Sequence, residues 1–263
     1  LQATGAGWYY TWSPDSPGSP GNYNADFYPM MARSWHATTA QVNNIKRYGQ
    51  MKYVFGFNEP ERADQANMTV DAAFAAWRDV ISPGFAGTAT QLVSPSVADT
   101  GGSTGGQAWL SSFMSQVRGA NLKIDAVAFH WYGASTPSNP AGAASSFLSR
   151  VDSYHNSYGL PVFITEFAIH DWGGAYTDDQ ITEANRQFLD IVVPALESRS
   201  YVAGYAFYPW FSDGKLFSGS PWTPTPMAYG YVGAIGSGST ADVGGMNLGE
   251  HVAYLTGGTL TMT

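Results

Sequence analysis

The chain has 263 residues, of which 44% are hydrophobic, so it can bury one large core. Its net charge of −8 argues against nucleic acid or an anionic membrane as partner, because both require basic surfaces. Cysteine is absent, which excludes disulfides, thiolate chemistry and cysteine-ligated zinc, and no apolar run reaches the roughly 18 residues that a membrane span needs.

Apolar strand-like runs alternate with helix-like segments along the chain. Strands are predicted near 8–12, 27–31, 53–57, 92–97, 126–131, 161–165 and 202–208, and helices near 38–48, 70–81, 107–117, 143–158 and 180–197. This alternation is typical of parallel strands joined by crossover helices, and eight such strands close a barrel. We therefore predict an α/β fold, a compact (β/α)8 TIM-barrel-like fold with a missing or shortened first strand. A doubly wound open sheet is the alternative, but no glycine-rich phosphate loop follows any strand.

The predicted domain organisation is one catalytic domain over residues 1–263. The barrel occupies about 7–235, and an extension over 236–263, rich in Gly, Ser and Thr, carries a hairpin near its end. Asn67-Met68-Thr69 matches the N-glycosylation pattern, which is weak support for secretion in a eukaryote. No signal peptide is visible at Leu1, so we expect a processed or trimmed start.

Two short strings carry the chemistry, Phe57-Asn58-Glu59-Pro60 and Ile164-Thr165-Glu166-Phe167. Each places a glutamate at the end of a run that reads as a buried strand, where a carboxylate costs desolvation energy and needs a reason to be present. Parallel barrel strands end on one face, so the two carboxylates can meet across a cleft. A pair of carboxylates is what cleavage of a glycosidic bond requires. Taken singly, Glu59 could complement a helix dipole and Glu166 could be a barrel-rim acid paired with a basic residue.

Other polar and aromatic residues are predicted at the same strand ends. Aromatic rings stack on the C–H faces of sugars, although any of them could instead belong to the core, and His130 could be a satisfied core histidine. No metal-ligand spacing occurs, so we predict neither metal nor cofactor. The predicted substrate-binding residues are Asn58, Trp12, Tyr10, His130, Trp131, Tyr132, Tyr208 and Trp210.

The strings Trp8-Tyr9-Tyr10-Thr11-Trp12, Phe27-Tyr28-Pro29-Met30-Met31 and His130-Trp131-Tyr132, together with the two glutamate strings, resemble glycoside hydrolase family 128 of clan A, which includes fungal β-1,3-glucanases. The resemblance implies a retaining enzyme with Glu59 as acid/base and Glu166 as nucleophile. It also implies that Asn58 hydrogen-bonds the substrate 2-hydroxyl.

From the residues and this resemblance we predict a secreted, monomeric retaining endo-β-1,3-glucanase of the extracellular space or cell wall. Its partner is β-1,3-glucan, polymer or oligosaccharide. The alternatives are exo action or action on oligosaccharides, another clan A specificity such as β-1,4-glucan or mannan, a non-catalytic β-glucan-binding protein on the same scaffold, and a structural wall protein.

Overall fold

A computed structural model of the chain describes residues 7–16, 25–49, 51–133, 137–208, 217–218, 223–224 and 255–257. They divide into two compact units. The amino-terminal unit comprises Tyr10–Asn22 and Phe27–His130, and the carboxy-terminal unit comprises Leu1–Tyr9, Tyr23–Asp26 and Trp131–Thr263. No described helix is long and apolar enough to cross a membrane.

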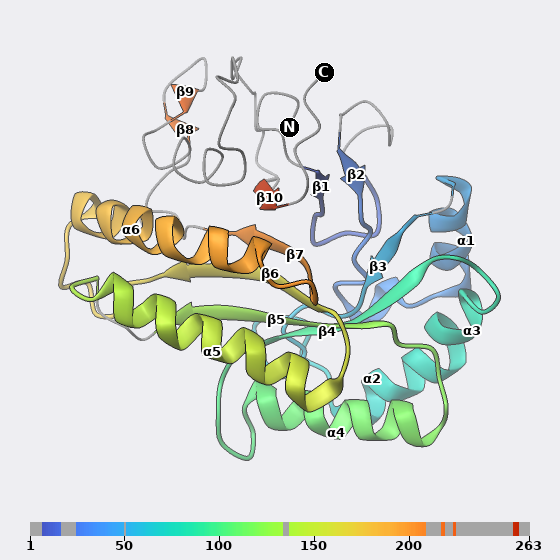
Figure 1. Ribbon diagram of the computed structural model, residues 1–263. Coiled ribbons are helices and arrows are strands. Elements are labelled where there is room, and N and C mark those ends of the chain that lie inside the picture. Colours follow the sequence, from blue (N-terminus) through green and yellow to red (C-terminus); the bar gives the residue numbers. More distant parts are fainter. Residues whose placement is uncertain are drawn as a thin grey trace. The chain divides into compact units, whose positions relative to one another are not determined.

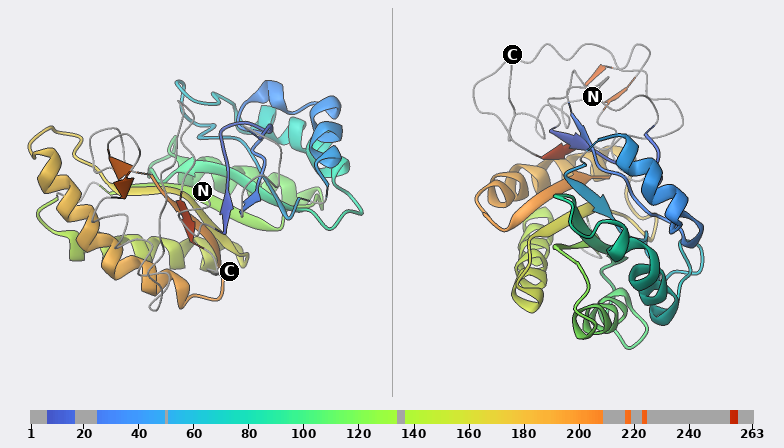
Figure 2. Two further views of the ribbon diagram at one scale, coloured as in Figure 1. Left: turned by 90° about the horizontal axis from the view of Figure 1, so that it is seen from above. Right: turned by 90° about the vertical axis from the view of Figure 1, so that its right-hand side faces the viewer.

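The amino-terminal unit alternates strands with helices (Figure 1). Strand β4 pairs in parallel with β3 on one side and with β5 on the other, as the crossover helices require. Figure 2 shows α2 and α4 side by side in this unit. Its elements are α1 (Thr39–Arg47), β3 (Tyr53–Phe55), α2 (Val70–Ala76), α3 (Ser82–Gly84), β4 (Gln91–Ala98), α4 (Gly106–Gly119) and β5 (Ala126–Gly133), whose last residues belong to the carboxy-terminal unit.

The first two predicted strands are shorter than expected. Strand β1 is Trp8–Tyr9 and β2 is Asp26–Phe27. The segment after β2 still runs in parallel beside β3, because Met30 bridges Phe55 and the carbonyl of Pro29 accepts a hydrogen bond from Phe55 at 2.8 Å. Proline has no N–H to donate, so Pro29 interrupts the ladder there.

The helix predicted over 70–81 has the predicted beginning but not the predicted end. Thr69 is the N-cap, because its Oγ1 accepts a hydrogen bond from the Ala72 N–H at 3.2 Å. Beyond α2 the chain continues through a π-helical turn, Trp77–Ile81, into α3. The predicted end near residue 81 was therefore wrong: Pro83 is tolerated because a proline in the first turn of a helix needs no N–H partner.

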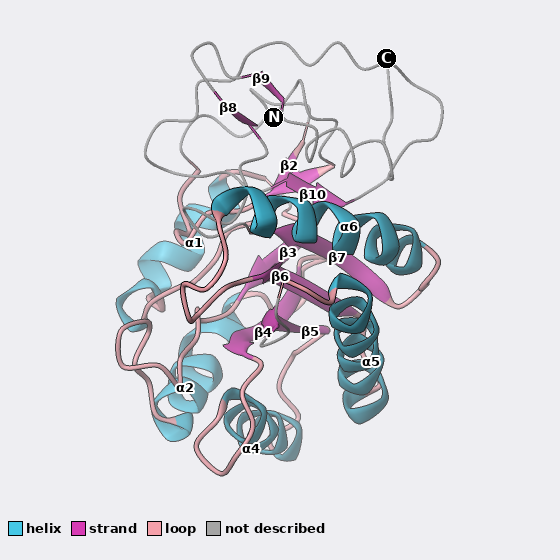
Figure 3. Cartoon of the chain, turned by 90° about the vertical axis from the view of Figure 1, so that its left-hand side faces the viewer, coloured by secondary structure: helices cyan, strands magenta, loops and turns pink. Residues whose placement is uncertain are grey.

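The carboxy-terminal unit contains the strand order β10-β7-β6, with β6 and β7 parallel and β10 antiparallel to β7. Helices α5 and α6 lie side by side along the strands (Figures 1 and 3). Its further elements are α5 (Pro140–Tyr158), β6 (Val162–Ile169), α6 (Asp178–Glu197), β7 (Val202–Phe207), β8 (Phe217–Ser218), β9 (Thr223–Pro224) and β10 (Leu255–Gly257).

An aromatic core joins these helices to the sheet. Phe147 of α5 stacks on Phe167 of β6 with centroids 5.0 Å apart, and Phe188 of α6 stacks on Trp131 at 5.6 Å. All four side chains are buried. This packing fixes β6 between the two helices and the neighbouring strands, and so it fixes the backbone on which Glu166 is carried.

Strand β6 is longer than predicted. The sequence predicted Glu166 at the end of its strand. Because β6 continues to Ile169, Glu166 instead lies within the strand. The predicted terminal hairpin over 252–262 falls mostly outside the described residues, and its described part, β10, pairs with β7.

Candidate active site

Glu59 sits in a tight turn that follows β3. The Glu59 N–H donates to the Ser96 carbonyl at 2.7 Å, and the Glu59 carbonyl accepts from the Arg62 N–H at 3.0 Å. Its φ of 39° lies in the left-handed region, which is uncommon for a residue with a Cβ. Such conformations cost on the order of 1–3 kcal/mol and cluster at functional sites. Here the surrounding hydrogen bonds hold the strained residue in place.

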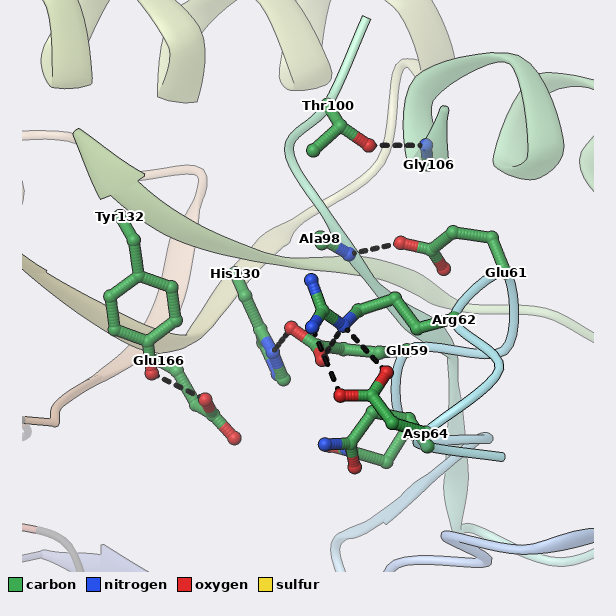
Figure 4. A network of polar contacts seen from close by, with 12 residues as sticks. Glu59, Glu61, Arg62, Asp64, Ala98, Thr100, Gly106, His130, Tyr132 and Glu166 are labelled. Carbon is green, nitrogen blue, oxygen red and sulfur yellow. Dashed lines mark hydrogen bonds and ion pairs between the residues drawn. The ribbon is translucent and has the colours of Figure 1, made fainter. Parts of the chain in front are cut away.

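The Glu59 carboxylate is buried, with 8% of its surface exposed, and contacts two basic side chains (Figure 4). Its Oε1 lies 3.0 Å from His130 Nδ1, and its Oε2 lies 3.2 Å from Arg62 Nε. His130 has no exposed surface. The histidine can donate or accept at Nδ1 according to its tautomer, so this contact is compatible with either protonation state of Glu59.

Glu61 anchors the same turn to the end of β4. Its Oε1 accepts the Ala98 N–H at 2.8 Å, as Figure 4 shows. A Cβ at Gly106 would come within 2.8 Å of this oxygen and 1.9 Å of the Ala98 carbonyl, so only glycine fits there. Burial raises the pKa of the Glu61 carboxyl above its usual value, its backbone hydrogen bonds oppose the rise, and the nearby charge of Glu59 adds to it.

Asn58 is buried directly before Glu59, with 3% of its surface exposed. Its Nδ2 donates to Gln65 Oε1 at 3.2 Å. Its Oδ1 is buried and accepts no hydrogen bond from any described residue. A buried amide oxygen that accepts no hydrogen bond costs free energy, and a ligand that donates a hydrogen bond to it would remove this cost.

Glu166 is the corresponding acid of the carboxy-terminal unit, with 6% of its surface exposed. Tyr132 of β5 donates its hydroxyl to Glu166 Oε2 at 2.5 Å (Figure 4). A phenol that donates to a carboxylate favours the charged form of that carboxylate. The half-buried ring of Tyr132 also meets Tyr208 edge-on, with centroids 6.3 Å apart.

Some of the predicted aromatic residues lie near the site, and others belong to the core. Tyr132 contacts Glu166, Tyr208 contacts Tyr132, and the partly exposed Trp12 lies in the amino-terminal unit. Trp131 was wrongly predicted as a sugar contact, because neighbouring strand residues point to opposite faces and its ring packs on Phe147 and Phe188. Tyr10 is likewise a core residue, with 0% exposed surface. Trp210 lies outside the described residues.

Sequence reasoning missed Arg62 and Glu61 as site residues, and it did not single out Trp172. Arg62 stands three residues after Glu59, a spacing that brings side chains together in a helical turn and so could have been noticed. Glu61 carried no such signal, because its partner is a backbone N–H that only the fold brings near. Trp172 follows β6 in a polar loop and is 64% exposed.

The geometry and the comparisons with known proteins agree on the class. A parallel α/β fold that carries buried carboxylates beside polar and aromatic partners is what a glycoside hydrolase presents. The family model described as "Glycosyl hydrolase catalytic core" matches residues 1–229. The chain belongs to this family, and it is a glycoside hydrolase.

Solved structures of family 128 enzymes are similar to this chain. The chain is 29% identical, over 88% of its length and 92% of the other chain, to a family 128 subgroup I endo-β-1,3-glucanase from Amycolatopsis mediterranei in complex with laminaritriose, with a TM-score of 0.73. It is 30% identical, over 85% and 88%, to a subgroup III curdlan-specific exo-β-1,3-glucanase from Blastomyces gilchristii, with a TM-score of 0.67. The predicted TIM-barrel-like fold and the resemblance to family 128 are thereby confirmed.

A curated relative from Schizosaccharomyces pombe (strain 972 / ATCC 24843), Alkali-sensitive linkage protein 1, is 29% identical over 214 residues. The match takes in 79% of this chain but only 34% of the relative. The chain therefore spans about a third of the length of that protein.

Proposed function

We propose that the chain is a retaining endo-β-1,3-glucanase with Glu59 as acid/base and Glu166 as nucleophile. The observation that carries the proposal is that both predicted glutamates are buried and hydrogen-bonded, each in its own polar network. Burial of a carboxylate costs desolvation energy, so two buried carboxylates need a reason to be present. The Amycolatopsis mediterranei enzyme supports the proposal, since its complexes with laminari-oligosaccharides include variants in which a glutamate is replaced by alanine at either of two positions.

Strand β5 connects the two networks in sequence. Side chains two apart on a strand share one face, and His130 and Tyr132 are two apart. His130 contacts Glu59, and Tyr132 contacts Glu166. A retaining mechanism requires the two carboxyl groups to lie roughly 5–5.5 Å apart.

In the first step Glu166 attacks the anomeric carbon while protonated Glu59 gives its proton to the leaving oxygen. The Tyr132 hydroxyl donates to Oε2 of the attacking carboxylate and so fixes its orientation. We expect the Asn58 amide to bind the 2-hydroxyl of the sugar, as the family resemblance implies, and its buried Oδ1, which accepts no hydrogen bond from any described residue, supports this role. In the second step Glu59, now ionised, takes a proton from the water that releases the sugar. His130 positions the Glu59 carboxyl, whose Oε1 lies 3.0 Å from Nδ1.

Endo action is the finer part of the proposal. The relatives include an endo-acting enzyme at 29% identity and an exo-acting one at 30%, so identity does not choose between them. We retain endo action on β-1,3-glucan, with secretion and a monomeric state, as predicted from the sequence. That catalysis needs no metal or cofactor also stays a prediction.

The experiment is product analysis on β-1,3-glucan, with mixed-linkage glucan, cellulose and mannan in parallel. Release of a ladder of oligosaccharides from β-1,3-glucan alone indicates endo action, and release of a single small product indicates exo action. Observation of the first-formed anomer by NMR tests retention. Binding of glucan without cleavage would favour the non-catalytic binding protein instead.

Glu166→Gln and Glu59→Gln test the two roles separately. Both should lose about 10²–10⁴-fold or more on glucan. On an aryl β-glucoside whose leaving group needs no proton, Glu59→Gln should still release the aryl group rapidly, whereas Glu166→Gln should not. Glu183→Gln is the matched control, because Glu183 is an exposed glutamate of α6 paired with Arg186. Near wild-type turnover by Glu166→Gln would refute the nucleophile assignment.

A further inference from the structure

Trp172 is a large exposed ring close to one of the two proposed catalytic acids. It lies in the loop after β6, the strand that carries Glu166, and 64% of its surface is exposed. Among the large apolar side chains of the described residues, only Trp35, Trp172 and Ile191 are exposed. A single exposed apolar residue is ordinary by itself, so any role for Trp172 depends on how it is held.

The loop that carries Trp172 is held by the carboxylate of Asp171. Its Oδ1 accepts the Gly173 N–H at 3.1 Å, and its Oδ2 accepts the Tyr176 N–H at 2.8 Å. These backbone hydrogen bonds, that from Tyr176 foremost, lower the pKa of Asp171, so the carboxylate remains charged at neutral pH. A charged acceptor of several N–H groups fixes the loop and with it the position of the indole.

Ring contacts connect Trp172 to the proposed nucleophile. Its indole meets the Tyr132 ring edge-on, with centroids 6.3 Å apart and an interplanar angle of 85°. His170 contacts the indole at 4.1 Å, also edge-on. The Tyr132 hydroxyl in turn donates to Glu166. Both neighbouring rings are nearly perpendicular to the indole, and 64% of the surface of Trp172 remains exposed to solvent.

We propose that Trp172 is a sugar-binding platform of the active site, on which a glucosyl unit of the β-1,3-glucan near the one attacked by Glu166 stacks its C–H face. The inference rests on the proposed glucanase function. The indole offers a large apolar face at little conformational cost, because its loop is already fixed. Removal of the ring should weaken binding of the substrate and of the transition state equally, since the sugar on the platform is not the one that reacts.

The test compares Trp172→Ala, Trp172→Phe and the control Ile191→Ala with the wild type on laminarihexaose and on laminaritriose. Ile191 is 44% exposed on α6, away from the ends of the strands. We expect Trp172→Ala to raise KM for laminarihexaose about tenfold with little change in kcat, the size expected when an aromatic anchor is truncated. Trp172→Phe should recover part of the loss, Ile191→Ala should behave as the wild type, and laminaritriose should be affected less.

Direct binding supplies the second measurement. Laminarihexaose should bind Glu166→Gln about tenfold more tightly than the Glu166→Gln, Trp172→Ala double variant in a calorimetric titration. Wild-type kinetics in Trp172→Ala, or a loss in kcat alone, would overturn the platform while leaving the glucanase function intact. Failure of the wild type itself to cleave β-1,3-glucan would instead refute the function on which the platform rests.

Discussion

Replacement of Asn185 by alanine should detach α6 from the end of β6. Asn185 is fully buried, its Oδ1 accepts the Ile169 N–H at 2.8 Å, and its Nδ2 donates to the Ile169 carbonyl at 2.9 Å. The last registered pair between β6 and β7 is Phe167 with Phe207, so Ile169 lies beyond that pairing. The asparagine side chain therefore takes the place of a neighbouring strand for this residue.

The loss of stability can be calculated from the polar groups of Ile169 that would lose their hydrogen-bond partner. Alanine would leave one buried N–H and one buried carbonyl of Ile169 without this partner, and each such group costs about 1–3 kcal/mol. We expect the free energy of unfolding to fall by roughly 2–5 kcal/mol. For a domain of this size each kcal/mol lowers Tm by about 2–4 °C, so Tm should fall by roughly 4–20 °C.

Urea unfolding followed by fluorescence and far-UV circular dichroism measures the change, and thermal scans give Tm. Asn156→Ala is the matched control, because Asn156 is an exposed asparagine of α5. It should change stability by no more than about 0.5 kcal/mol. If Asn185→Ala were no more destabilising than Asn156→Ala, the reasoning that these two hydrogen bonds replace strand pairing would be wrong.

Two smaller predictions follow from buried contacts. The pKa of Glu61 is raised chiefly by burial, so its contribution to stability is complete below its unfolded pKa of about 4.5 and is lost as pH rises through the folded value. Glu61→Gln cannot ionise, so urea unfolding between pH 4 and 8 should show the wild type losing stability relative to the variant as pH rises; a constant difference would contradict this. Gly204→Ala should destabilise by about 1–3 kcal/mol, because its Cβ would lie 2.8 Å from Cζ2 of the buried Trp8. An unchanged Tm in Gly204→Ala would show that the core around Trp8 relaxes freely.

Local sequence was sufficient for the regular elements. The helix over 180–197 could be predicted because Thr177 precedes it, and the structure shows the Thr177 hydroxyl accepting the Gln180 N–H at 3.3 Å. Gly159 marks the end of α5 because its φ of 63° favours glycine. The strings around Glu59 and Glu166 were also visible, since an acid directly after an apolar run is unusual. These signals depend on a few neighbouring residues, so no tertiary information was needed to read them.

The faces and partners of the site residues were decided only by the tertiary structure. Sequence placed Trp131 and Tyr132 together at a strand end, but side chains alternate along a strand, so Trp131 packs on Phe188 while Tyr132 reaches Glu166. The choice of face depends on which helices cover the sheet. The partners of Glu59 and Glu61 come from β4 and β5, and residues far apart in sequence meet only when the chain has folded. The sequence by itself therefore determined which acids this enzyme carries, and the packing of strands and helices determined which side chains orient them.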